Sequence, residues 1–120
     1  GPDTDWMVKL VDVSPGGYAM NVAEGILRAR FRNGLTKAEL LQPGRTYEFT
    51  VDMVGTAVEF QKGHRIRVDI MSSNFPQFSV NPNTGEPLAT AGRGRKANNT
   101  VFHGGVKASA IILPVVAPLP

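Results

Sequence analysis

Two histidines are the side chains with which this chain could most readily do acid–base chemistry. His64 opens a predicted strand after a glycine turn, and His103 lies in a predicted loop. A serine hydrolase also needs a nucleophile, which commonly stands on a Gly-x-Ser-x-Gly turn, and the sequence has no such turn. We therefore interpret both histidines as structural, with His64 hydrogen-bonded to its own turn or facing solvent. We predict no catalytic residue in this chain.

Three acidic residues near the start of the chain, Asp3, Asp5 and Asp12, raise the question of a calcium site, because this hard cation binds clustered oxygens. The pair Asp3 and Asp5 lacks the further ligands and the glycine of a calcium-binding loop. Capping of a turn is the preferred interpretation of these two carboxylates. The absence of cysteine excludes disulfides and thiolate metal sites. We predict neither a metal nor a cofactor.

The composition is that of one small globular domain, because 120 residues suffice for a single core and the hydrophobic fraction of 42% is close to the globular average. The net charge is only +3, and the basic residues Arg93, Arg95 and Lys96 have no interleaved aromatic side chain on which bases could stack. No apolar run approaches the ~18 residues of a membrane span. We expect no nucleic acid and no membrane as partner. The expected protein is soluble and bacterial in type, and the sequence does not separate the cytoplasm from secretion.

Alternation of apolar and polar residues predicts an all-β fold with five or six strands. The strands are expected at residues 6–13, 26–32, 46–53, 58–60, 64–72 and 107–113. The stretch 46–53 alternates most regularly and is expected to form a main wall of the core. Proline and glycine at 14–17 predict a tight turn after the first strand. Residues 37–41 can form at most one helical turn.

The same alternation predicts which side chains each strand buries. In the strand at 64–72 the residues expected on the inner face are Ile66, Val68 and Ile70. In the strand at 26–32 the residues expected on a solvated face are Arg28, Arg30 and Arg32. Half-buried strands with one apolar and one charged face are typical of an antiparallel sheet.

The segment 74–100 shows no periodicity and is expected to be a long loop, which in a compact domain is usually functional or part of an interface. It contains Phe75 and Phe78, which we select together with Trp6 as candidate interface residues. One interpretation of these aromatic residues is core packing or loop anchoring. The other is a domain interface, because aromatic anchors dominate such contacts. A proline-rich tail is expected at 114–120.

Six short blocks occur in the order in which a known family has them. They are DTDW at 3–6 with KLVDV at 9–13, EGILRARFR at 24–32, LLQPG at 40–44, FQKGHRIRV at 60–68, SSNFPQF at 72–78 and NPNTG at 81–85. Together the blocks resemble the C-terminal domain of the X-prolyl dipeptidyl-peptidases, which is also found in cocaine esterases, α-amino-acid ester hydrolases and glutaryl acylases. The resemblance extends over residues 3–116.

The resemblance implies a galactose-binding-like jelly roll, a β-sandwich without catalytic residues of its own. In that family the domain packs beside an α/β-hydrolase domain, which supplies the serine, acid and histidine for hydrolysis of esters or amides. The implied roles of this domain are to support the hydrolase domain, to help wall the substrate pocket and to support oligomerisation.

The family also has further strands before the first block, so we expect a single β-sandwich domain over residues 1–120 that lacks its N-terminal strands. Residues 1–2 are expected to be the remnant of an expression tag. The raw sheet edge of such a domain favours a homo-oligomer or complementation by another chain.

Two alternatives stay open from the sequence. A carbohydrate-binding jelly-roll module has the same fold, but fold alone does not give function. Such a module would need an exposed aromatic platform, whereas Trp6 lies in a predicted strand. An excised or engineered fragment that self-assembles is the second alternative, and it would account for the absent strands.

Overall fold

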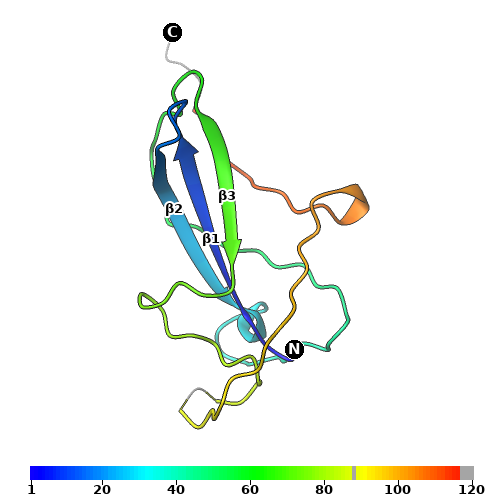
Figure 1. Ribbon diagram of the computed structural model, residues 1–120. Coiled ribbons are helices and arrows are strands. Elements are labelled where there is room, and N and C mark those ends of the chain that lie inside the picture. Colours follow the sequence, from blue (N-terminus) through cyan, green and yellow to red (C-terminus); the bar gives the residue numbers. More distant parts are fainter. Residues whose placement is uncertain (88, 117–120) are drawn as a thin grey trace.

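The computed structural model describes residues 1–87 and 89–116, and its regular part is a three-stranded antiparallel sheet in the order β2-β1-β3 (Figure 1). The strands are β1 (Asp5–Val13), β2 (Ala19–Arg28) and β3 (Arg65–Met71). The described residues also contain two short 3-10 helices, η1 (Ala29–Phe31) and η2 (Gly105–Lys107). The fold is therefore all-β, as predicted, with fewer strands than the five or six expected. No helix in this part of the chain is long and apolar enough to cross a membrane.

β1 and β2 form a hairpin around the predicted turn at 14–17. Gly17 has a φ of 89°, in the left-handed region that glycine enters without steric cost. The register places Trp6 opposite Leu27 and Asp5 opposite Arg28. The residues of the turn and the alternation in the strands thus determine the β1–β2 hairpin from nearby parts of the sequence.

β3 pairs antiparallel with the other edge of β1 and confirms the strand predicted at 64–72 to within one residue at each end. Its apolar side chains were expected on an inner face, and this prediction is wrong. Ile66, Val68 and Ile70 remain substantially exposed, because the described residues provide no second sheet to cover them.

The segment 46–53, predicted as a main wall of the core, forms no strand in the structure. Its side chains nevertheless alternate between exposed and partly buried. The partly buried ones are Tyr47, Phe49, Val51 and Met53. The segment lies against β2, because a Cβ atom added at Gly25 would overlap the carbonyl oxygen of Asp52. Phe49 packs on Trp6 with a distance of 5.6 Å between ring centroids. The amphipathic pattern is present, but no neighbouring strand among the described residues pairs with it.

Other predicted elements also differ from the structure. The strands expected at 58–60 and 107–113 are not formed, and the second of these begins at the last residue of η2. Residues 37–41 contain no helical turn, which is within the predicted limit of one turn. The strand expected at 26–32 ends at Arg28, where η1 turns the chain. A strand requires a partner for its backbone groups, and alternation alone does not supply one. Of the predicted tail, residues 117–120 lie outside the described part of the chain.

The buried core is small and half polar. Within the described residues the buried apolar side chains are Met7, Leu10, Val11, Val13, Ala23 and Ala29. The buried polar ones are as numerous, namely Asp3, Thr4, Asp5, Asp12, Arg30 and Asn81. The Cα radius of gyration is 16.7 Å, above the value of about 14 Å for a compact domain of this length. The molecule is thus extended around a short sheet.

Candidate functional site

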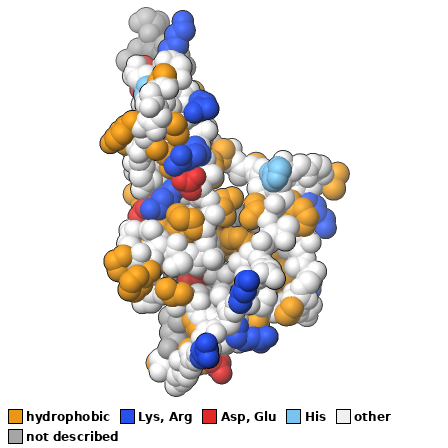
Figure 2. All heavy atoms as spheres, in the orientation of Figure 1, with side chains coloured by type: hydrophobic (Ala, Val, Ile, Leu, Met, Phe, Trp, Pro, Cys, Tyr) orange, Lys and Arg blue, Asp and Glu red, His pale blue; other side chains and the backbone are white. Residues whose placement is uncertain are grey.

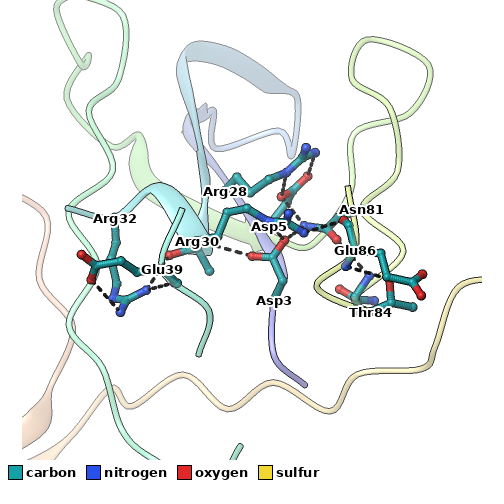
Figure 3. Close-up of polar contacts among 11 residues, drawn as sticks. Asp3, Asp5, Arg28, Arg30, Arg32, Glu39, Asn81, Thr84 and Glu86 are labelled. Carbon is teal, nitrogen blue, oxygen red and sulfur yellow. Dashed lines mark hydrogen bonds and ion pairs between the residues drawn. The ribbon is translucent and has the colours of Figure 1, made fainter. Parts of the chain in front are cut away.

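Opposite charges face each other across the open end of the hairpin (Figure 3). The Nε and Nη2 atoms of Arg28 donate hydrogen bonds to the two carboxylate oxygens of Asp5 at 2.8 and 2.9 Å. Two residues farther from the turn, Arg30 Nε donates to Asp3 Oδ2 at 2.8 Å. The backbone N–H of Arg30 donates to Asp3 Oδ1 at 3.0 Å. Asp5 and Arg28 form the last pair of β1 and β2, and Asp3 with Arg30 continues the same register beyond the ends of the strands.

The solvated face predicted for the arginines is therefore wrong. Asp3 is fully buried and Arg30 nearly so, because η1 turns the chain inward directly after β2. A buried guanidinium needs a carboxylate partner, and removal of either member would leave an uncompensated charge. The hydrogen bonds that Arg28 donates to the carboxylate of Asp5 raise the pKa of Arg28. Asp3 still accepts a backbone N–H within η1, as a capping carboxylate does, but its main partner is a charged side chain.

Asn81 joins the two ion pairs to the long loop. Its side-chain amide donates to Asp3 Oδ2 and to Asp5 Oδ1, both at 2.8 Å, and the residue is 3% exposed. Its Oδ1 accepts the backbone N–H of Asn83 at 2.9 Å. Asn83 has a φ of 59°, a left-handed conformation that asparagine tolerates well in turns. Both protons and the oxygen of one buried amide are thus used.

Further hydrogen bonds hold the loop at 74–100 to the sheet and to itself. Gln77 Nε2 donates to Glu24 Oε1 of β2 at 2.6 Å, and this bond is the main cause of the lowered pKa of Glu24. Farther along, three more hydrogen bonds have lengths of 3.0 Å. Arg30 Nη2 donates to Glu86 O, Asn83 Nδ2 donates to Arg95 O, and Asn99 Nδ2 donates to Thr4 Oγ1. The loop therefore has defined anchors although it contains no helix or strand among its described residues.

The three candidate interface residues lie in different environments. Phe75 is 73% exposed, and Figure 2 shows hydrophobic side chains gathered over the loop that follows β3. Phe78 is partly buried and lines a cavity of about 320 Å³ together with Met7 of β1. Trp6 points to the opposite face of β1 from Met7, because consecutive strand residues alternate, and it packs on Phe49. The structure groups Phe75 and Phe78 on one loop and separates Trp6 from them.

The backbone N–H of His64 donates to Gln61 O of its own turn at 3.0 Å, as predicted, whereas its side chain pairs with Asp12, which the sequence analysis did not predict. The distance between His64 Nδ1 and Asp12 Oδ1 is 2.8 Å. Asp12 lies opposite Ile66 in the sheet register, so His64 reaches it diagonally from two residues before that pair. His103 is exposed in the loop before η2. Within the described residues no group of three or more histidine or acidic side chains is placed to hold a metal ion.

The ion pairs and Asn81 escaped the sequence analysis for different reasons. Asp5 lies opposite Arg28 in the hairpin, but the register shifts between Leu10 and Val11, so counting outward from the predicted turn does not give the charged pairs. Asn81 lies 76 residues from Asp5 along the chain, and no local pattern indicates its partners.

Comparison with known proteins finds a family model and several longer proteins that this chain resembles. Residues 1–112 match the family model described as the X-Pro dipeptidyl-peptidase C-terminal non-catalytic domain. Over 116 residues the chain is 40% identical to cocaine esterase from Rhodococcus sp. (strain MB1 Bresler), a match that covers 95% of this chain and 20% of that protein. The crystal structure of an aminopeptidase from the marine sediment archaeon Thaumarchaeota archaeon is similar over 70% of this chain and 15% of that one, with a TM-score of 0.67 and 35% identity. The chain thus spans about a fifth of the length of the curated relatives it matches.

Proposed function

The chain belongs to the family of X-Pro dipeptidyl-peptidase C-terminal non-catalytic domains, and we propose that it is the accessory domain of a larger serine hydrolase. The parent protein hydrolyses an ester or amide through an acyl-serine intermediate, with its serine, histidine and acid in a separate α/β-hydrolase domain. One relative is named an esterase and another an aminopeptidase, which supports both bond types as candidates. The accessory domain supports the hydrolase domain, helps to wall its substrate pocket and contributes to oligomerisation.

The observation that carries this proposal is the loop at 74–80, which is anchored to the sheet while its aromatic tip faces solvent. Gln77 and Asn81 tie the loop to β2 and to the buried ion pairs. Phe75 precedes both anchors in the chain and is 73% exposed. A large aromatic side chain on a pre-organised loop loses little conformational entropy when a partner buries it, which suits an interface anchor. In this proposal Phe75 inserts into the hydrolase domain, and Phe78, which lines the cavity beside Met7, holds the loop against the sheet.

Trp6 supports a second contact with the rest of the parent protein. Its indole N–H is buried without a hydrogen-bond partner among the described residues. A buried donor without an acceptor costs about 1–3 kcal/mol. Trp6 also lines an open pocket beside Ile70 and Met71, where a neighbouring domain could pack and rearrange the surroundings of the indole. The environment of Trp6 does not favour the carbohydrate-binding alternative, because its ring packs on Phe49 and does not form an open platform. Sugars are accordingly expected to leave Trp6 fluorescence unchanged.

We extend the proposal to the complete fold, which we take to be a galactose-binding-like jelly roll. The amphipathic segment 46–53 alternates like a strand but has no partner among the described residues. Strands contributed by the rest of the parent domain would pair with this segment and cover its partly buried side chains. This reasoning also favours complementation by parent segments over an isolated, engineered fragment as the natural state of the chain.

The test compares two equally exposed aromatic residues in the full-length protein. Phe75 and Tyr18 are both 73% exposed, but Tyr18 follows the hairpin turn and lies outside the loop at 74–80. Phe75→Ala is expected to weaken the contact between the domains by about 2 kcal/mol, measured as a lower melting temperature and a lower kcat/KM on a chromogenic ester or an Xaa-Pro anilide. Tyr18→Ala is expected to leave both unchanged. Equal effects of the two substitutions would contradict the proposed interface.

A further inference from the structure

Asn33 is followed by Gly34 in the turn after η1, and this is the single Asn-Gly step of the 120 residues. Both residues are exposed. Gly34 has a φ of 128°, a conformation that residues with a Cβ rarely adopt. A Cβ built at Gly34 would meet nothing within 4 Å, so the backbone there is open to solvent. No side chain therefore shields the nitrogen of Gly34 from the amide of Asn33.

Two hydrogen bonds hold the two groups that can react with each other at this step. Asn33 Nδ2 donates to Glu39 Oε2 at 2.8 Å, which keeps the amide in one orientation. The backbone N–H of Gly34 donates to Phe31 O at 3.1 Å, and this bond must open before the nitrogen can attack the side chain. Exposed turns open at little cost in free energy. Folding is therefore expected to slow the reaction without preventing it.

The other asparagines of the chain lack one of these features. Asn81 precedes a proline, whose nitrogen carries no proton, and its own amide is buried and hydrogen-bonded. Each of the remaining ones precedes a residue with a Cβ, which crowds the approach to the backbone nitrogen; they are Asn21, Asn74, Asn83, Asn98 and Asn99. Asn98 is exposed, as Asn33 is, and provides an internal comparison.

We propose that Asn33 is a site at which the chain modifies itself by deamidation through a cyclic imide, and that the modification loosens the segment 35–41. The nitrogen of Gly34 gives up its proton and bonds to Cγ of Asn33. The bond from Cγ to Nδ2 breaks, and ammonia leaves with that proton. This inference concerns the turn after η1 and does not rest on the proposed function.

Water opens the imide and is the only co-reactant. Cleavage between Cγ and the nitrogen of Gly34 leaves aspartate at position 33. Cleavage between the backbone carbonyl carbon and that nitrogen leaves isoaspartate, in which the main chain runs through the former side chain. Both products carry one more negative charge than asparagine, and isoaspartate also lengthens the main chain by a methylene group.

Both products replace a hydrogen-bond donor by a carboxylate next to Glu39. Glu39 also pairs with Arg32 Nη2 at 3.5 Å (Figure 3) and with Lys37 Nζ at 3.8 Å. The new carboxylate repels Glu39 and competes for these two cations. The backbone N–H of Glu39 donates to Arg30 O at 2.7 Å, which holds the segment 35–41 to η1. A lengthened main chain at the turn disturbs this contact, so the segment is expected to open more often.

The test ages the full-length protein at neutral and at mildly alkaline pH and follows each asparagine by peptide mass after trypsin digestion. Trypsin cuts after Arg32 and Lys37, and Asn33 is the one asparagine in residues 33–37. Synthetic peptides distinguish aspartate from isoaspartate, and an unaged sample corrects for conversion during digestion. Conversion at Asn33 is expected to be about tenfold or more faster than at Asn98. It should be faster at the higher pH, because the attacking nitrogen must lose a proton.

Asn33→Gln is the matched control. It keeps an amide donor for Glu39, but its longer side chain must close a larger ring and is expected to stay unmodified. Aging of the wild-type protein should also speed cleavage of the folded chain after Lys37, whose side chain is 82% exposed. The same aging of Asn33→Gln should leave that cleavage rate unchanged.

Three results would overturn the inference. The first is an Asn33 that stays an amide in the folded protein over the time in which a urea-unfolded sample converts. The second is conversion that is no faster at Asn33 than at Asn98. The third is an aged wild-type protein that is cut after Lys37 no faster than a fresh one. None of these outcomes bears on the proposed function, which is tested by substitution of Phe75.

Discussion

At the scale of single residues, the node around Asn81 is the part of the molecule with the least tolerance for change. One amide satisfies two buried carboxylates, Asp3 and Asp5, each of which also pairs with an arginine. Buried polar networks are stable when every member has a partner and costly when one is lost. The node also fixes the start of β1 to the loop at 74–100. A single side chain therefore connects the sheet to the proposed interface.

Asn81→Ala is expected to lower the free energy of unfolding by about 2–4 kcal/mol, because two hydrogen bonds to charged acceptors are lost. Urea denaturation measures this change, and limited proteolysis should show faster cleavage within 74–100. Asn98→Ala is the matched control, since Asn98 is exposed in the same loop. Similar losses for the two variants would show that the node does not anchor the loop.

A pH-dependent tether connects the same loop to β2. The hydrogen bond from Gln77 lowers the pKa of Glu24, so the folded chain keeps this carboxylate ionised below its ordinary pKa of about 4.3. A lowered folded-state pKa contributes stability above the ordinary value, and that stability is lost as the pH falls through the lowered value. The tether should thus hold at neutral pH and weaken in acid.

An NMR titration of the side-chain amide of Gln77 should show a midpoint below about 4.3. In the variant Gln77→Ala the midpoint of Glu24 itself should move upward, because the main cause of the lowering is gone. A Glu24 midpoint that is the same in both proteins would mean that the hydrogen bond does not form in solution.

At the scale of elements, sequence reasoning succeeded where the determinants are local. β1, the turn at 14–17 and β3 follow from alternation and turn chemistry, which are properties of a few neighbouring residues. The segment 46–53 has the best alternation of the chain and still forms no strand. Its backbone would need a partner, which is a non-local condition that no local pattern reports. The solvated face assigned to Arg30 failed because β2 ends two residues earlier and η1 changes the direction of the side chain.

The packing of 46–53 against β2 depends on the absence of a side chain at Gly25. Gly25→Ala would place a Cβ against the carbonyl of Asp52, so the segment must move away, at a cost of about 1–3 kcal/mol. Because Phe49 in this segment packs on Trp6, the fluorescence of the single tryptophan should shift to the red. Gly55→Ala is the control, since a Cβ there meets nothing within 4 Å. An unshifted spectrum for Gly25→Ala would contradict the described packing.

At the scale of the whole molecule, the chain is extended and has a small core, which agrees with the proposed contact to a neighbouring domain. Its radius of gyration of 16.7 Å is large for its length, and half of its buried side chains are polar or charged. The family resemblance carried by six short blocks is confirmed by the family match over residues 1–112. The blocks include the buried node, with its acidic residues at 3–6, its arginines at 24–32 and its asparagine at 81–85. The resemblance could therefore be seen in the sequence, while the physical role of these residues required the structure.

The most direct test of the central claim, a non-catalytic domain joined to a serine hydrolase, is to label the full-length protein with a serine-directed fluorophosphonate and to map the label by mass spectrometry. We predict stoichiometric labelling of one serine outside the 120 residues described by this sequence, and no labelling of the isolated chain. A label on a serine within these residues, or a full-length protein that takes up no label, would contradict the account.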